Sequence, residues 1–244
     1  EIPDSCQWCT FLRNHDELTL EMVTEEDRQF LWDFYAPVKR MRQNLGIRRR
    51  LAPLLDGDAR KIALLNAVLF ALPGTPIIYY GDEIGMGDNI YLEDRDGVRT
   101  PMQWTNGKNA GFSNTDEDNL YLPIIKSDQF SYTKINVAAQ LEDPHSLFHQ
   151  IRHLLEIRKK NPVWAEGSYE IIYNSDYPAL LTIKRTDGTN TSVTFHNLSD
   201  KIIPIDLSDV GVAGRKLVDL VRGTDLEKSK LALAPYAYLW LIEQ

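Results

Sequence analysis

The residues best suited to chemistry in this sequence are Asn14, His15 and Asp16, which follow a short, mostly apolar run over residues 7–13. Such a run is typical of a strand that is buried on both faces of a parallel sheet. A carboxylate held where this strand ends could stabilise the positive charge of the oxocarbenium-like state through which glycosyl transfer passes. A histidine beside it could donate hydrogen bonds to sugar hydroxyls. The alternative is that Asp16 only caps a turn.

Two other groups could in principle bind a metal ion, and both have a simpler interpretation. Cys6 and Cys9 form a C-x-x-C pair, but the sequence has only these 2 cysteines, so we expect two unpaired, buried thiols. His145, His149 and His153 share one face of an expected helix, and no acidic or cysteine partner completes a ligand set nearby. We expect a solvated or partly packed helix face there, and no metal site.

The composition restricts the classes of partner. The net charge is −8, and an acidic surface repels phosphates, so we expect no nucleic-acid partner. No apolar stretch reaches the roughly 18 residues needed to cross a bilayer, so no membrane association is expected. With only 2 cysteines the chain fits a reducing compartment, and we expect a cytoplasmic protein. The basic run at residues 48–50 is interpreted as a solvated helix face or a turn.

The elements expected in the first part of the chain alternate between strands and helices. A helix is predicted over residues 24–41, with Thr24 as its N-cap, and a second over residues 58–72, with Asp58 as its N-cap. A further buried strand is predicted over residues 75–80. This succession of strand, helices and strand is the alternation of a parallel α/β sheet.

The later part changes character twice. Residues 85–140 are polar and irregular, and a loop of this length in a compact domain is usually functional. A helix is then predicted from Asp143 to Lys160, with Asp143 as its cap. Beyond residue 165, short alternating runs predict a small all-β domain. These runs lie at residues 169–173, 179–184, 192–198, 202–207 and 231–242.

Three segments, in the right order, resemble motifs of the α-amylase superfamily (glycoside hydrolase family 13). Residues 11–18, FLRNHDEL, resemble its seventh-strand motif, and residues 74–86, GTPIIYYGDEIGM, resemble its eighth strand. Residues 95–104, RDGVRTPMQW, resemble the segment after that strand in α-glucosidases, oligo-1,6-glucosidases and trehalose synthases. Within the superfamily, residues 14–24 and 135–147 are most similar to the trehalose synthases. The resemblance spans essentially the whole chain.

The resemblance implies roles for three residues. Asp16 corresponds to the aspartate that stabilises the transition state and binds the ring hydroxyls of the glucosyl unit being cleaved, and His15 to the histidine that contacts the same hydroxyls. Arg99 corresponds to an arginine that binds the terminal glucose from the far side of the pocket. A planar guanidinium with several donors suits that task. The alternative for Arg99 is an ion pair within its loop, with Asp94 or Asp96.

The resemblance also implies which part of the superfamily fold is present. Residues 1–162 would hold only the last two βα units of a (β/α)8 TIM barrel, and residues 163–244 a small antiparallel β-sandwich domain. The nucleophilic aspartate and the acid/base glutamate lie on the fourth and fifth strands, and no segment here resembles either motif. We therefore expect a C-terminal portion that is inactive alone and needs the missing N-terminal barrel half, and the lack of an initiator methionine agrees. Glu83 is expected to be structural.

The function that the resemblance implies is the interconversion of maltose and trehalose by retaining transfer of a glucosyl unit. Maltose, trehalose and glucose would be the ligands, and no cofactor is expected. One alternative is a hydrolytic α-glucosidase or oligo-1,6-glucosidase, in which water is the final acceptor. Another is a non-catalytic, carbohydrate-binding fragment built on the β domain, with Tyr236, Tyr238 and Trp240 as candidate contacts. The sequence leaves open which of these applies and whether the protein is a homo-oligomer.

Overall fold

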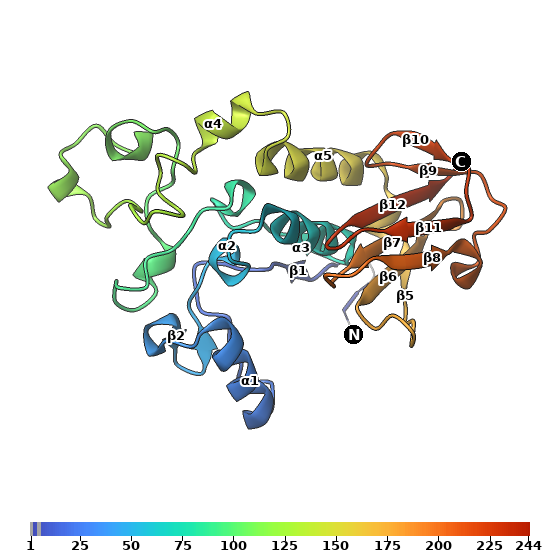
Figure 1. Cartoon of the computed structure of the whole chain (residues 1–244), viewed down its shortest axis with the longest axis horizontal. Helices are drawn as coiled ribbons and strands as arrows, with labels where there is room; N and C mark the ends of the chain where they lie inside the picture. The colour runs from blue at the N-terminus through green and yellow to red at the C-terminus, as the bar shows by residue number, and fades with distance from the viewer. Residues whose placement is uncertain (1, 4–5) are drawn as a thin grey trace. The chain divides into compact units, whose positions relative to one another are not determined.

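The computed structural model describes residues 2–3 and 6–244. The described chain divides into two compact units, each assembled from segments that are distant in the sequence (Figure 1). The first unit consists of the residues up to Thr10, Ala63–Ile77 and Gln150–Gln244, and the second of Phe11–Ile62 and Ile78–His149. The domain boundary expected between residues 162 and 163 stays a prediction.

The first unit contains a parallel strand pair, as the α/β alternation predicts. β1 (Cys9–Thr10) pairs with β4 (Thr75–Pro76). The prediction of buried strands over residues 7–13 and 75–80 is wrong in both extent and burial, since each observed strand has two residues and both Trp8 and Ile77 are exposed. Among the residues that the structure describes, this two-stranded sheet has no further member. In a larger parallel sheet, the faces of such strands are covered by packed helices.

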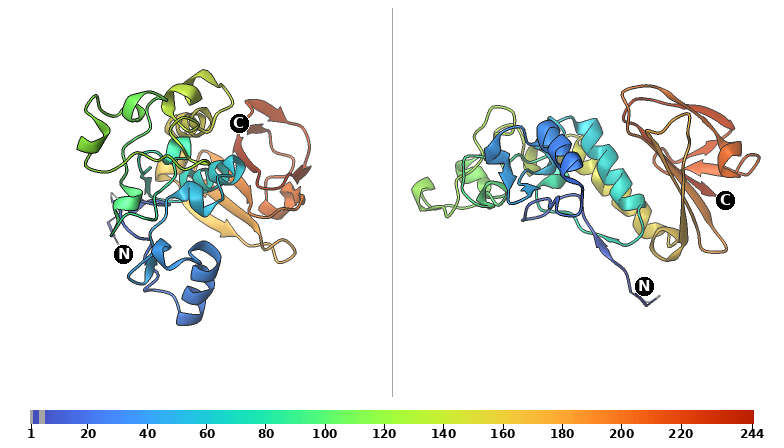
Figure 2. Two further views of the ribbon diagram at one scale, coloured as in Figure 1. Left: turned by 60° about the vertical axis from the view of Figure 1, so that its left-hand side comes forward. Right: turned by 90° about the horizontal axis from the view of Figure 1, so that it is seen from below.

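Two helices of this unit lie side by side (Figures 1 and 2). They are α3 (Ala59–Ala71), whose first residues belong to the second unit, and α5 (Leu147–Lys160), which begins there as well. Arg158 of α5 donates from Nη2 to the carbonyl of Gly74 at 2.7 Å and from Nη1 to the carbonyl of Phe70. This arginine therefore joins the C-terminal turns of the two helices.

The starts of the two helices test the predicted caps. The amide of Arg60 donates to Asp58 Oδ1 at 2.9 Å, so Asp58 caps α3 as expected. α5 begins at Leu147 rather than at Asp143. Ser146 takes the capping position, because its Oγ accepts from the amide of His149 at 3.4 Å. Asp143 instead closes the turn before the helix.

Two antiparallel sheets form the C-terminal part of the first unit. A six-stranded sheet has the order β10-β9-β12-β7-β6-β5, and β8 pairs with β11 in a two-stranded sheet. The strands β9 and β10 were not predicted, and the run at residues 231–242 is divided between β11 and β12 by a turn in which Tyr236 has a φ of 56°. The strands are β5 (Ser168–Ile172), β6 (Leu180–Thr186), β7 (Thr191–Asn197), β8 (Ile203–Asp206), β9 (Leu217–Asp219), β10 (Thr224–Leu226), β11 (Lys230–Leu233) and β12 (Tyr238–Glu243).

The two sheets share one hydrophobic core. Alternate residues of each strand enter it, because successive side chains of a strand point to opposite faces. Val193 and Phe195 of β7, Ile205 of β8 and Leu241 of β12 are examples. Trp240 points the other way, yet it is also buried, with its ring centroid 4.9 Å from that of Trp164. Trp240 is therefore a core residue, which excludes it as an exposed carbohydrate contact.

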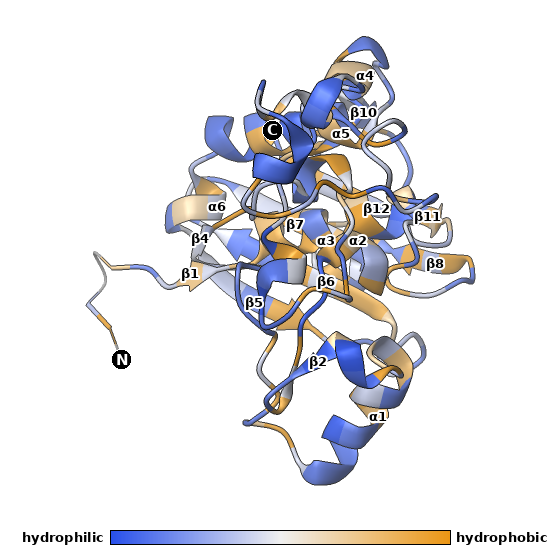
Figure 3. Cartoon of the chain, turned by 90° about the vertical axis from the view of Figure 1, so that its left-hand side faces the viewer, coloured by the Kyte–Doolittle hydropathy of each residue, from blue (hydrophilic) through white to orange (hydrophobic). Residues whose placement is uncertain are grey.

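The second unit begins with a small helical layer. α1 (Glu25–Tyr35) starts at Thr24, whose Oγ1 accepts from the amide of Asp27 at 3.1 Å, so the predicted cap is confirmed. The helix ends well before residue 41, because Pro37 disfavours helical backbone at the residue that precedes it. α1 mixes hydrophilic and hydrophobic residues (Figure 3). The other elements here are η1 (Lys39–Met41), β2 (Arg42–Gln43), β3 (Gly46–Ile47) and α2 (Leu51–Leu54).

The long polar segment predicted as a loop is packed around a core of its own. Ile84, Met86, Met102 and Ile125 form this core, and Gln103 donates from Nε2 to a backbone carbonyl across the segment. Its regular pieces are η2 (Asp82–Ile84), η3 (Asp96–Val98), η4 (Lys108–Gly111), η5 (Glu117–Asn119) and α4 (Val137–Glu142). None of the helices in the described residues combines the length and the apolar character that crossing a bilayer requires.

Candidate active site

Arg48 and Arg50 of the basic run at residues 48–50 are buried and Arg49 is half-buried, which corrects the expectation of a solvated face or a turn. Arg48 donates from Nη1 to the carbonyl of Leu92 at 2.7 Å and to that of Asp94. Arg50 is 0% exposed. A guanidinium carries five N–H donors and can therefore serve several carbonyl groups at once. Arg48 thus holds the backbone immediately before the 95–104 motif.

Arg13 fixes the turn that carries Asp16. The buried Arg13 donates from Nη2 to the carbonyl of Asp16 at 3.1 Å and to that of Ile47 at 3.0 Å. Asn14 Oδ1 accepts from the amide of Asp16 at 2.9 Å. The backbone of Asp16 is thus tied to the interior of the second unit, while 44% of its side chain is exposed.

Arg95 lies at the centre of a charge cluster around the Asp16 carboxylate. Arg95 Nε is 2.6 Å from Asp16 Oδ1 and 2.9 Å from Glu17 Oε2, and Nη1 is 2.6 Å from Asp94 Oδ1. Hydrogen bonds with Glu17 and Arg95 lower the pKa of Asp16 well below its usual range. The carboxylate is therefore ionised at ordinary pH, as a group that stabilises positive charge must be. Arg95 is not among the residues for which the resemblance implies a role.

Arg99 lies next to His15. Arg99 Nε donates to the carbonyl of His15 at 2.9 Å, although the two residues are 84 positions apart. Asp94, the alternative partner considered for Arg99, pairs with Arg95 instead. The three residues expected to bind sugar therefore come together in the second unit, and their roles stay predictions.

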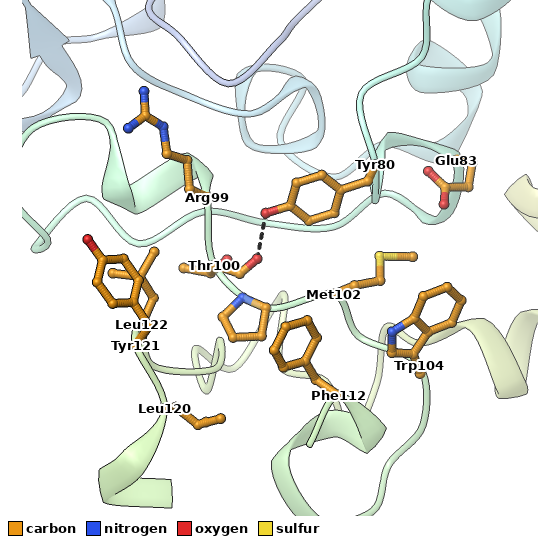
Figure 4. A pocket seen from close by; sticks show the side chains of 11 residues that line it. Tyr80, Glu83, Arg99, Thr100, Met102, Trp104, Phe112, Leu120, Tyr121 and Leu122 are labelled. Carbon is orange, nitrogen blue, oxygen red and sulfur yellow. Dashed lines mark hydrogen bonds between the residues drawn. The ribbon is translucent and has the colours of Figure 1, made fainter.

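A cavity of about 410 Å³ lies beside Arg99 in the second unit (Figure 4). Its walls are mainly apolar and include the rings of Tyr80, Trp104, Phe112 and Tyr121. Small-molecule sites are typically apolar cavities with a few polar groups that fix the orientation of the ligand. His15 and Asp16, both of them described, are not part of this lining.

Glu83, which we expected to be structural, is the second charged residue of the lining (Figure 4). Its Oε2 is buried and has no hydrogen-bond partner among the described residues, and burial raises the pKa of this carboxyl. A bound hydroxyl is the kind of donor that such an oxygen lacks. The sequence around Glu83 does not distinguish binding of a ligand hydroxyl from a purely structural role.

The two groups weighed as metal ligands have ordinary environments. Cys6 and Cys9 are free thiols as expected, but both are exposed, which corrects the expectation that they are buried. His149 and His153 each bond a backbone carbonyl, at 3.2 and 2.9 Å, which is a partly packed face. Over residues 2–3 and 6–244, no group of three or more His, Cys, Asp or Glu is placed to hold a metal ion.

Asp82 gives the free energy of unfolding a pH dependence that can be measured. Burial raises the pKa of Asp82 to about 7, although Arg50 Nη1 lies 3.7 Å from its Oδ1 and opposes the shift. The unfolded value is about 3.9, so between these values the folded chain keeps a proton that the unfolded chain has lost. The free energy of unfolding therefore falls as the pH rises through this window.

Replacing Asp82 with Asn removes this ionisation. We expect Asp82→Asn to gain about 2–3 kcal/mol relative to the wild type when the pH is raised from about 5 to 8, as measured by urea unfolding. Asp58→Asn is the matched control, because Asn also caps helices and the bond with Arg60 lowers the pKa of Asp58. Its difference from the wild type should stay constant over this range. A constant difference for Asp82→Asn would contradict the prediction.

The sequence and the fold of this chain are similar to those of known proteins. Residues 48–167 match the family model described as the catalytic domain of alpha amylase. Arg99 lies inside the matched range, whereas His15 and Asp16 precede it.

Two curated relatives are trehalose synthases. One, from Pimelobacter sp. (strain R48), is 50% identical over 226 residues, which are 91% of this chain and 39% of that protein. The trehalose synthase/amylase of Mycobacterium tuberculosis (strain ATCC 25618 / H37Rv) is 49% identical over 208 residues, 84% of this chain and 35% of that protein. The chain thus spans well under half the length of these relatives. Trehalose-6-phosphate hydrolase from Bacillus licheniformis has a similar fold, with a TM-score of 0.67, 22% identity, and coverage of 97% of this chain and 43% of that one.

Proposed function

Because the chain belongs to the α-amylase family, we propose that it is the C-terminal portion of a retaining α-glucosyl-transforming enzyme that interconverts maltose and trehalose. The identity of 50% over 91% of the chain to a trehalose synthase supports this choice within the family. The observation that carries the site assignment is the hydrogen bond of 2.9 Å from Arg99 Nε to the carbonyl of His15. It joins the two sequence motifs that the proposal needs at one substrate site.

The proposed roles follow from the geometry of each side chain. Asp16, ionised and held by Arg95, stabilises the positive charge that develops on the glucosyl unit and binds its ring hydroxyls. His15, exposed beside it, contacts the same hydroxyls. Arg99 binds the glucose from the side of the cavity. The unpartnered oxygen of Glu83 accepts a hydroxyl hydrogen bond in the same cavity.

The remaining chemistry belongs to residues outside this chain. Retaining transfer needs a nucleophilic carboxylate and an acid/base carboxyl, about 5 Å apart, to form and break a covalent glycosyl-enzyme. In the proposal these two groups belong to the N-terminal barrel half. The second glucose is held in the cavity while the glucosyl unit is bound covalently, and is then joined to it by an α,α-1,1 bond. Exclusion of water from the closed site favours this captive sugar as the acceptor.

The proposed fold completes a barrel from two pieces. The parallel pair β1–β4 supplies the last two strands of the (β/α)8 barrel, and the exposed Trp8 and Ile77 mark where the missing barrel half packs. The two antiparallel sheets with a common core are the β-sandwich domain. Two free cysteines support a reducing, cytoplasmic location.

The hydrolytic α-glucosidase remains the second candidate, because the same residues would serve with water as the acceptor. The relative from M. tuberculosis, which is called a trehalose synthase/amylase, favours keeping it. The carbohydrate-binding alternative loses its strongest candidate, since Trp240 lies in the core.

The test is a product assay on the complete enzyme, this chain together with the barrel half that precedes it. With maltose as the substrate, we expect trehalose as the main product and little free glucose, since the acceptor sugar is retained. With trehalose as the substrate, maltose should appear. Glucose without any trehalose would exclude the isomerase and favour the hydrolase. The Asp16→Asn enzyme serves as the control, and should yield neither product.

A further inference from the structure

We propose that Tyr79 and Tyr80 form a clamp that positions Arg99, so that the two hydroxyls are positioning groups for substrate binding; this inference rests on the proposed function of Arg99. The hydroxyl of Tyr79 donates to the carbonyl of Val98 at 3.0 Å, and that of Tyr80 donates to the carbonyl of Thr100 at 2.7 Å. The two acceptors belong to the residues immediately before and after Arg99. The clamp therefore holds the backbone on both sides of this one residue.

The arrangement of the two rings is unusual for adjacent residues. In a regular strand, neighbouring side chains point to opposite faces. Here the ring centroids of Tyr79 and Tyr80 are 4.6 Å apart, at an interplanar angle of 62°, and both rings serve the same segment. The strand β4 ends at Pro76, so the backbone that carries the tyrosines is free of the constraint of a sheet.

Arg50 packs against the rings of both Tyr79 and Tyr80. Its guanidinium carbon lies 4.6 Å from the centroid of each tyrosine ring, and its Nη1 donates to the carbonyl of Tyr80 at 2.7 Å. Arg50 is 0% exposed. A desolvated cation between two aromatic faces is attracted to both. These contacts restrict rotation of both tyrosine side chains, so the two hydroxyls stay near the carbonyl groups that they bind.

Arg99 differs from its two neighbours in the exposure of its side chain. Val98 and Thr100 are buried, whereas Arg99 is partly exposed and lines the cavity. A free arginine side chain carries about 2 kcal/mol of rotamer entropy, part of which is lost on binding a ligand. The clamp at both backbone carbonyls and the bond to the carbonyl of His15 restrict Arg99 before substrate arrives. Such preorganisation improves binding.

The experiment is a double-mutant cycle in the complete enzyme, with Tyr79→Phe, Tyr80→Phe, the double Phe variant and Arg99→Ala. Each Phe variant keeps the ring and removes one hydroxyl. Tyr79 is the more informative position, because Tyr80 itself lines the cavity whereas Tyr79 does not. Loss of one such hydrogen bond should raise the KM for maltose about three- to tenfold, with a smaller change in kcat. In the Arg99→Ala background the same substitutions should raise KM no further.

The outcomes separate the clamp from the proposed function. Equal effects of the Phe variants with and without the Arg99 side chain would overturn the clamp, because the hydroxyls would then act through folding. A normal KM for Arg99→Ala would overturn the proposed role of Arg99 instead. Tyr91→Phe is the control, since Tyr91 is 72% exposed and should leave KM unchanged. If the double Phe variant fails to fold, the single variants decide in the same way.

Discussion

Asp16→Asn in the complete enzyme is expected to lower kcat on the order of a thousandfold while leaving the fold intact. The substitution preserves the shape of the side chain and removes only its charge, which is the property that stabilises an oxocarbenium-like state. Stability should change by about 1 kcal/mol or less, because the side chain is 44% exposed and Arg95 keeps Glu17 and Asp94 as partners. Steady-state kinetics on maltose and urea unfolding measure the two effects.

The matched control for this variant is Asp94→Asn. Asp94 binds the same guanidinium at 2.6 Å, and its side chain is 52% exposed. The Asp94→Asn substitution removes one negative charge from the same cluster and leaves the proposed substrate contact, Asp16, in place. We therefore expect kcat to stay within a few-fold of the wild type. Similar losses in both variants would show that the charge balance of the cluster matters rather than Asp16 itself. Near-normal turnover of Asp16→Asn would mean that Asp16 only caps a turn.

The 244-residue chain on its own is expected to show no turnover. A transition-state-stabilising carboxylate without a nucleophile and an acid/base group cannot complete retaining transfer. The measurement is the release of the chromophore from an aryl α-glucoside by the purified chain. Addition of the N-terminal barrel half should restore activity, if the two pieces assemble.

A contaminating glucosidase is the main source of error in that assay, and Asp16→Asn in the isolated chain is the control for it. Activity that survives the substitution comes from another protein. Activity that disappears with it would show that this chain carries its own nucleophile, and the assignment of the missing groups to an upstream barrel half would then be wrong.

Much of the local structure could be predicted from the sequence, because its determinants lie within a few residues of one another. Thr24 and Asp58 cap helices as expected, and each cap is a bond to an amide two or three residues away. The parallel pairing of β1 with β4 followed from the alternation of elements. The candidate site is a prediction of a different kind, because it rests on the resemblance of two motifs, which implies roles for Asp16 and Arg99.

Other features depend on which partner a side chain meets across the fold. The arginines at residues 48–50 have the composition of a solvated run, yet Arg48 and Arg50 are buried because distant carbonyl groups accept their hydrogen bonds. Trp240 was a candidate carbohydrate contact with a core position as the alternative, and its packing on Trp164 decides for the core. Strand β1 read as buried, and its burial depends on neighbouring strands that the described chain does not contain.

The sequence by itself thus determined the helix caps at Thr24 and Asp58 and the two motifs, with their family resemblance, that carry Asp16 and Arg99. Only the tertiary structure decided that Arg95, 79 residues away, binds Asp16, and that two tyrosine hydroxyls hold the backbone around Arg99. The physical reason is one of range. A cap or a turn is set by contacts between near neighbours in the chain, whereas an ion pair or a buried donor needs a partner that only folding brings within about 3 Å.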